Sequence, residues 1–287
     1  MSAVVGIAVA TTVTAAVRGT WSPCGASMLS TLTPFGERAR GHRYWSTAAW
    51  FVVGGILGGT CLGLAGVTLS LLARWAEMGT TTVMTVCAIS AVVTLSSDLR
   101  LVRLRLPSHP RQVDENWVNR FRPWVYATGF GWQIGTGFAT YVMSAITYLM
   151  VVAAALTARP LIAWGLGVGF GAIRGLSLLT GSRQHNPAAA RRFHARFEAL
   201  RPVSWRVAVG VQVAVFGIAS ATVGSPAVRA ALVAVGALTA ARWLQRSSTS
   251  LAASWRSQRR ARGYPKSTIR QGSTSMPVTS ARNSLPS

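Results

Sequence analysis

The chain has 287 residues, of which half are hydrophobic and only 12% are charged, and its mean hydropathy is +0.36. A soluble domain of this size does not need so apolar a composition. The sequence also lacks the phosphate-loop, zinc-binding and Ser/His/Asp patterns of soluble enzymes, so we expect no metal and no cofactor. The composition therefore favours an all-helical protein that crosses the lipid bilayer several times.

Apolar segments recur along the whole chain. A helix needs about 20 mostly apolar residues to cross about 30 Å of hydrocarbon. The sequence predicts seven such spans within a transmembrane domain over residues 1–245, and their cores are 3–17, 49–72, 81–95, 125–156, 161–179, 207–223 and 227–244. The first span lacks the positively charged start of a cleaved signal peptide, so we expect it to be retained.

The basic residues are distributed unevenly between the loops. In a soluble protein the net charge of +23 would indicate nucleic-acid binding. Here the basic residues lie mainly in alternate loops, and the turns around residues 76–80, 158–160 and 224–226 are nearly uncharged. Because basic loops stay in the cytoplasm, we expect a cell-membrane protein with its amino terminus outside and its carboxyl terminus inside. No nucleic-acid partner is expected, and only the basic tail would suit one.

Two segments at the cytoplasmic side have special compositions. Residues 187–200 predict an amphipathic helix along the anionic inner leaflet, with Arg191, Arg192 and Arg196 on or near its polar side. Residues 246–287 consist largely of Ser, Arg, Thr and Pro and cannot build a core. They predict a disordered, basic cytoplasmic tail.

Two apolar stretches, 3–34 and 124–156, are too long for one simple crossing, and each is interrupted. The interruptions read Trp-Ser-Pro-Cys-Gly from Trp21 and Trp-Gln-Ile-Gly-Thr-Gly from Trp132, 111 residues further on. At the same offset, Gly54 and Gly58 match Gly165 and Gly169. The pattern predicts an inverted three-helix repeat, over about 3–97 and 124–223, followed by an extra span over 227–244.

Broken helices at matching places of two repeats are typical of a working site near the membrane midplane. Cys24 is the candidate catalytic residue, because Pro23 removes a helix hydrogen bond beside its thiol. The plainer interpretation is a small buried side chain next to a tolerated kink. The other candidate residues of the helix breaks and the pocket between them are Trp21, Pro23, Gly25, Trp132, Gln133, Gly135, Thr136, Gly137 and Arg174.

Each polar candidate also has a structural interpretation. Arg174 either faces a cavity or extends to the cytoplasmic surface, and Arg18 is a similar case. Gln133 and Thr136 either bind a solute or satisfy the carbonyl groups that the break frees. Cys61 and Cys87 are expected to pack in ordinary apolar helices. The three cysteines make neither a disulfide framework nor a metal cluster.

The Trp21-Ser22-Pro23-Cys24 break, the glycine-rich second span and the Gly-Trp before the second break resemble the membrane family of CcdA and the central domain of DsbD. The resemblance covers roughly residues 4–179. It implies inverted three-helix repeats, and it implies that reducing equivalents pass from a thioredoxin-like partner to thiols across the membrane, with Cys24 as one redox cysteine. The chain departs from the family where Ile134-Gly135 stands in place of the second Pro-Cys.

One thiol cannot complete this exchange alone, because a second sulfur must resolve the mixed disulfide. Either Cys61 or Cys87 supplies it, or a partner protein does, or the redox activity has been lost. The resulting hypothesis is a divergent thiol-reductant conduit. Two alternatives are a transporter of a small solute or ion, with Gln133, Gly135 and Arg174 lining its path, and a non-catalytic membrane partner protein.

Overall fold

The computed structural model describes residues 2–101, 113–139, 142–223 and 226–243, and within these ranges every regular element is a helix. The structure therefore confirms the all-helical class. In chain order the elements are α1 (Ser2–Gly19), α2 (Pro23–Thr31), α3 (Pro34–Ala39), α4 (Tyr44–Trp75), α5 (Thr80–Asp98), α6 (Trp117–Arg120), α7 (Pro123–Gly135), α8 (Ile146–Leu156), α9 (Pro160–Leu176), η1 (Ser177–Gly181) and α10 (Pro187–Thr222). A last helix covers residues 226–243.

Five helical segments are long and apolar enough to cross a membrane, namely α1, α4, α5, α9 with η1, and α10. They coincide with the first, second, third, fifth and sixth predicted spans. The predicted fourth span consists of two shorter helices, α7 with 13 residues and α8 with 11. The predicted seventh span overlaps the helix over 226–243, and the predicted tail lies outside the described residues. Seven crossings therefore stay a prediction.

The predicted amphipathic helix over 187–200 and the predicted span over 207–223 form one continuous helix, α10, of 36 residues. Pro202 lies inside it. A proline removes one backbone hydrogen bond, but here the helix continues through it. Asn186 caps the start of α10, because its side chain accepts a hydrogen bond from the backbone N–H of Ala189 at 2.8 Å.

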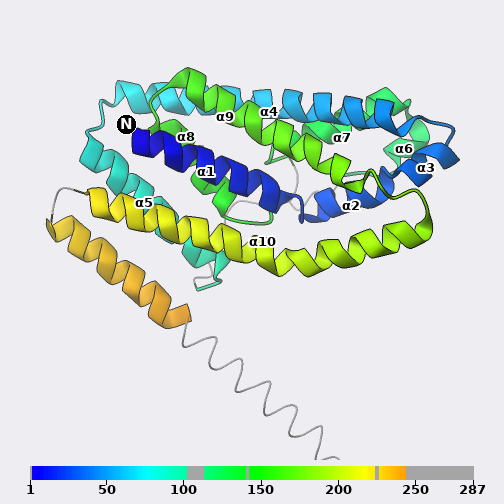
Figure 1. Ribbon diagram of the computed structural model, residues 1–287. Helices are drawn as coiled ribbons and strands as arrows, with labels where there is room; N and C mark the ends of the chain where they lie inside the picture. The colour runs from blue at the N-terminus through cyan, green and yellow to red at the C-terminus, as the bar shows by residue number, and fades with distance from the viewer. Residues whose placement is uncertain (1, 102–112, 140–141, 224–225, 244–287) are drawn as a thin grey trace, which may run out of the picture. The chain divides into compact units, whose positions relative to one another are not determined.

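Helix α4 lies between α7 and α9 at very short range (Figure 1). A Cβ atom added to Gly58 would come within 2.2 Å of the Trp132 carbonyl oxygen on α7, and one added to Gly59 within 2.5 Å of the Gly167 carbonyl oxygen on α9. Only glycine permits such close backbone approach. The two faces of α4 therefore hold two partner helices without side chains between them.

The two glycine pairs that match at the offset of 111 residues lie in different surroundings. Gly54 and Gly58 contact α7, as close packing requires, but Gly165 and Gly169 have open space where a Cβ would lie. The contacts to α4 come from Gly167 and Gly171 instead. Glycines alternate along this part of α9, so the sequence alone did not distinguish the face that packs from the face that is exposed.

The remaining long helices surround this centre. α1 packs against α8, α9 and α10, and α5 packs against α8 and α10 (Figure 1). Near the start of α1 an apolar cluster joins five helices and includes Ala8, Cys87, Leu149, Val215 and Leu232. α1 and α5 begin at the same end of the structure, so their carboxyl ends point the same way.

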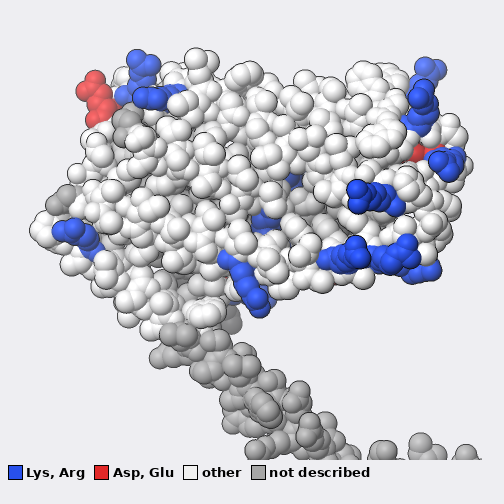
Figure 2. All heavy atoms as spheres, viewed as in Figure 1, with Lys and Arg blue, Asp and Glu red and all other residues white. Residues whose placement is uncertain are grey.

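Charged side chains gather mainly at the two ends of the long helices (Figure 2). α4 has no charged residue between Tyr44 and its last turn at Arg74. Basic side chains are most numerous at the end formed by α3 and the first part of α10 (Figure 2). An apolar middle with charged ends suits a lipid bilayer.

Candidate functional site

The first break is a change from one helix to another. α1 ends at Gly19, and the backbone turns through Thr20 and Trp21 before Ser22 caps α2 by accepting a hydrogen bond from the Gly25 N–H at 3.1 Å. Pro23 takes the first position of α2, where the missing N–H costs nothing. Pro23 therefore starts a helix, and the kink predicted from its position in an apolar stretch is wrong.

Cys24 is the second residue of α2, and its side chain is 1% exposed. It belongs to an apolar cluster that also includes Met28, Phe51 and Phe130. Gly25 permits the close backbone approach in this turn, because a Cβ atom there would lie 2.3 Å from the Thr20 carbonyl oxygen. The thiol is thus held at a helix amino terminus, where backbone N–H groups attract negative charge.

The second break is the carboxyl end of α7. Thr136 bonds back to the Trp132 carbonyl oxygen through both its backbone N–H and its hydroxyl, and Gly137 follows with a φ of +74°. This is a usual helix end, with a glycine in the left-handed region. Thr136 therefore satisfies a freed carbonyl, the structural interpretation considered from the sequence. Gln133 is half-buried.

Arg174 of α9 connects the two breaks. Its side chain is 4% exposed, and its Nε lies 3.5 Å from the Ile134 carbonyl oxygen near the end of α7. Its guanidinium also lies against Gly19 at the end of α1, where an added Cβ would be 2.5 Å from Nη1. Helix carboxyl ends carry partial negative charge. One cation therefore serves the ends of two broken helices.

The Arg174 guanidinium thus packs against the start of the turn that leads from α1 to Cys24. Its Nη1 has no hydrogen-bond acceptor among the residues that the structure describes. Arg174 is therefore buried rather than extended to the surface. The site contains a thiol, a cation and one donor that is still available.

The two tryptophans do not share this junction. Trp21 stacks on Phe197 of α10 at a ring distance of 4.8 Å and donates a hydrogen bond to the Phe197 carbonyl oxygen at 2.7 Å. The Trp132 side chain is 41% exposed on α7. Arg174, and not the tryptophan pair, brings the two breaks together.

A polar cavity of about 650 Å³ lies beside the first break, and its lining includes Trp21, Pro23 and Arg18. Of the described residues that line it, none belongs to the second break, and Cys24 and Arg174 are not among them. The matching helix breaks predicted one pocket shared by both. The structure has a packed junction at Arg174 and a separate cavity, because the glycine contacts of α4 bring α7 and α9 too close for an open space.

The other two cysteines lie away from this junction. Cys87 is buried on α5 in the apolar cluster at the start of α1, and Cys61 is exposed on α4. All three cysteines are free. No group of three His, Cys, Asp or Glu residues that would suit a metal ion occurs within the described ranges.

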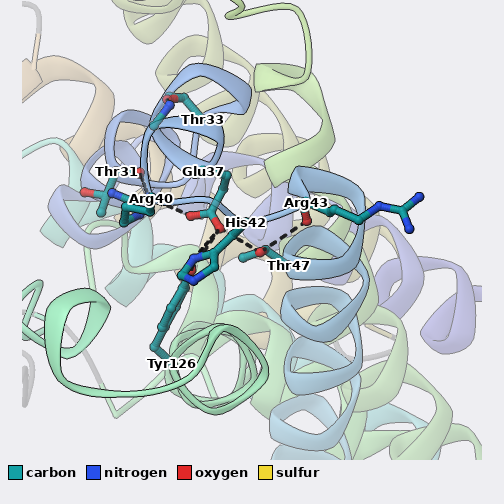
Figure 3. A network of polar contacts seen from close by, with 9 residues as sticks. Thr31, Thr33, Glu37, Arg40, His42, Arg43, Thr47 and Tyr126 are labelled. Atoms are coloured by element: carbon teal, nitrogen blue, oxygen red, sulfur yellow. Dashed lines mark hydrogen bonds and ion pairs between the residues drawn. The ribbon is translucent and has the colours of Figure 1, made fainter.

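Sequence reasoning missed a buried carboxylate at Glu37 (Figure 3). Glu37 of α3 is fully buried and accepts hydrogen bonds from Arg40 at 2.6 Å, from Thr47 of α4 at 2.7 Å and from Tyr126 of α7 at 2.9 Å. His42 Nδ1 lies 3.6 Å from the same carboxylate. The network joins three helices. The sequence indicates it only indirectly, because the chain has just six acidic residues and each of them is therefore a candidate for a specific role.

Asp98 was missed for the same reason. It ends α5 and accepts hydrogen bonds from the Ala145 N–H at 2.7 Å, the Ser144 hydroxyl at 2.6 Å and the Gln212 amide at 2.9 Å. A carboxylate at the start of α8 suits the positive end of that helix. Asp98 thus connects α5, α8 and α10 at the wall of the polar cavity.

The sequence matches no protein-family profile, and no solved structure matches it. Its relatives share one name, methylamine utilization protein MauF. The relative from Paracoccus denitrificans is 32% identical over 139 residues, which are 48% of this chain and 50% of that protein. The relative from Paracoccus versutus is 29% identical over 143 residues, 48% and 51% of the two chains, and that from Methylorubrum extorquens is 29% identical over 153 residues, 49% and 50%.

The chain spans about half the length of the curated relatives it matches. Their name does not specify a thiol-reductant conduit or a transporter. The resemblance to CcdA and DsbD rests on the residues around the two breaks and stays a prediction.

Proposed function

We propose that this chain is a multi-pass membrane protein that acts in methylamine utilization, as its relatives are named to do, and that Cys24 is its exchanging thiol. The observation that carries the second part is the placement of Cys24. It lies at the amino terminus of α2, just after the turn from Gly19, against which the buried Arg174 guanidinium packs. Both groups attract the negative charge that a thiolate carries during exchange.

The exchange needs sulfur from outside the chain, because Cys61 and Cys87 lie elsewhere. The Cys24 thiolate attacks a disulfide of an acceptor protein, which forms a mixed disulfide and releases the other acceptor sulfur as a thiolate that takes up a proton. A thiolate of a thioredoxin-like dithiol donor then attacks the Cys24 sulfur and frees the reduced acceptor. The second thiol of the donor displaces Cys24, so that two electrons pass from the donor to the acceptor.

The packing of α4 on α9 supports the inverted repeat on which this function rests. Gly55, Gly59 and Gly63 on α4 contact a series of glycines on α9 spaced in the same way. Each matches the glycine 112 residues later, at 167, 171 and 175, an offset one residue longer than that between the two breaks. The two helices are antiparallel. If each glycine is replaced by its match on the other helix, the contact between Gly55 and Gly171 becomes the contact between Gly167 and Gly59, which the structure also contains. An inverted repeat with its axis between α4 and α9 would produce this symmetry.

The test compares cysteine variants in a Paracoccus denitrificans strain that lacks its own MauF. The Cys61→Ser/Cys87→Ser variant retains Cys24 alone, and we expect it to support growth on methylamine as well as the unmodified chain does. Cys24→Ser should abolish that growth at equal amounts of protein in the membrane. Undiminished growth of the Cys24→Ser strain would rule out the thiol function.

A second candidate function rests on the unpaired donor. A transporter would need the packed junction at Arg174 to open in another conformation, in which Arg174 Nη1, which has no acceptor among the described residues, would meet an anionic solute. In that case Arg174→Gln stops flux and Cys24→Ser has little effect. If both changes are harmless, the chain is a non-catalytic partner protein in the membrane.

A further inference from the structure

The polar cavity beside the first break has an excess of positive charge. Three arginines, Arg18, Arg100 and Arg201, line it together with one carboxylate, Asp98. Asp98 already accepts hydrogen bonds from Ser144 and from the start of α8. Glu198, which does not line the cavity, pairs with Arg201 at 2.7 Å, so three arginines still face only two carboxylates. The cavity therefore suits an anion.

Arg18 is the most buried of the three arginines. Its side chain is 6% exposed, and its Nη1 donates to the Ser204 hydroxyl at 2.9 Å. Its Nε has no partner among the described residues. A buried guanidinium with a free donor at the wall of a cavity indicates a site for a negatively charged group.

Helix lengths place this cavity at the depth of lipid head groups. α1 has 18 residues and α5 has 19, they begin at the same end of the structure, and both end at the cavity (Figure 1). At about 1.5 Å per residue each spans about 27 to 29 Å, close to the thickness of the hydrocarbon core. Trp21 and Trp205 line the cavity, and tryptophan is enriched at that depth.

Apolar grooves lead away from the cavity on both sides of α10. One, of about 580 Å³, lies between α5, α10 and the helix over 226–243 and shares Trp205 with the cavity. The other, of about 290 Å³, lies between α1 and α10 and shares Arg18 and Trp21 with it. A cationic site between two apolar grooves matches a charged head with two hydrocarbon chains.

We propose that this cavity and its grooves bind an anionic phospholipid. The phosphate lies among Arg18, Arg100 and Arg201, and the acyl chains lie along the two grooves of α10. The proposal rests on the membrane location proposed above and is independent of Cys24. The chemistry selects an anionic head group, because a zwitterionic one adds a further cation beside the three arginines.

The test is native mass spectrometry of the full chain, released from nanodiscs that contain equal amounts of phosphatidylglycerol and phosphatidylcholine. We expect one phosphatidylglycerol to remain bound with at least tenfold preference. Arg201→Gln should lower that preference, whereas Arg191→Gln, an exposed arginine on the same helix outside the cavity, should leave it unchanged.

A second pair of variants tests the groove. Gly210 lines the larger groove, and an added Cβ there would meet nothing within 4 Å, so Gly210→Phe fills the groove without displacing backbone. Gly217 is equally open and lines neither groove. We expect Gly210→Phe to lose the lipid and Gly217→Phe to retain it, with unchanged thermal unfolding in both.

Other outcomes overturn the proposal. Equal retention of the two lipids would show that the arginines do not select the head group. Binding of glycerol 3-phosphate or inorganic phosphate as tight as that of the lipid would identify a soluble-anion site. A chain that leaves the membrane fraction without detergent would instead contradict the membrane location. Loss of the lipid in Cys24→Ser would show that this site is not independent of the thiol.

Discussion

Glu37 remains buried because both of its carboxylate oxygens have donors. The donors come from Arg40, Thr47 and Tyr126, so that the carboxylate connects the short α3 to α4 and α7 (Figure 3). A buried charge that loses its partners destabilises the fold. Removing the charge likewise leaves its buried donors without an acceptor. This residue therefore holds together the end of the structure at which α7 begins.

Glu37→Gln tests that role. The amide keeps one acceptor oxygen but places its N–H donors opposite either Arg40 or the Thr47 and Tyr126 hydroxyls, so we expect the free energy of unfolding to fall by about 1 to 3 kcal/mol. Glu198→Gln is the matched control, because Glu198 makes an exposed ion pair with Arg201 and should change stability by less than about 1 kcal/mol. Thermal unfolding in detergent measures both. Equal effects would contradict the assigned role.

Arg174 acts at the same scale, on the carboxyl ends of α1 and α7. Arg174→Gln removes the cation from both ends, and we expect a loss of about 1 to 2 kcal/mol in unfolding free energy. Arg174→Lys should recover part of it. Arg159 is an exposed arginine just before α9, and Arg159→Gln should have no such effect. A loss of stability as large as that of Arg174→Gln would contradict the role of Arg174 at the two helix ends.

At the scale of the element, glycine spacing decides which helices meet. A Cβ atom added to Gly171 would lie only 2.1 Å from the Gly55 carbonyl oxygen, whereas one added to Gly169 on the same helix would meet no atom within 4 Å. We expect Gly171→Ala to destabilise the protein by about 1 to 3 kcal/mol through overpacking. Gly169→Ala should be neutral or stabilising by up to about 1 kcal/mol. Thermal unfolding of the two variants should therefore move in different directions, and similar losses would contradict the packing of α4 on α9.

Long apolar helices were predictable from the sequence because hydropathy alone determines them. α1, α4, α5 and α9 lie where their apolar segments predicted. The continuity of α10 was not predictable, because a change from amphipathic to apolar sequence at Pro202 usually marks a boundary. The breaks were found in the right places, but Pro23 was interpreted as a kink, since its role at a helix start depends on the Ser22 cap.

The candidate site was only partly predictable for a related reason. Cys24 and Arg174 were identified from their chemistry and their apolar surroundings. The Glu37 and Asp98 networks were not, because their partners lie far away in the sequence and only the fold brings them together. The predicted shared pocket became a packed junction because the spacing of backbones depends on glycine contacts that hydropathy does not report.

At the scale of the whole molecule, the charge distribution determines the expected orientation. The basic end formed by α3 and the start of α10 belongs in the cytoplasm if the chain follows the usual loop-charge rule (Figure 2). We expect a single cysteine placed at Gly79, in a cysteine-free background, to react with an impermeant maleimide from outside the cell. A cysteine at His185 should react only after the cells are opened. The reverse pattern would contradict the orientation.

The central claim is that Cys24 exchanges thiols, and direct trapping tests it. The Cys61→Ser/Cys87→Ser chain in membranes is mixed with a thioredoxin-like protein whose resolving cysteine is replaced, and the products are separated without reductant and identified by mass. We predict one mixed disulfide per chain at Cys24, formed more slowly in Arg174→Gln and partly restored in Arg174→Lys. If no mixed disulfide forms while the chain still supports growth on methylamine, Cys24 is a packing residue and the account is wrong.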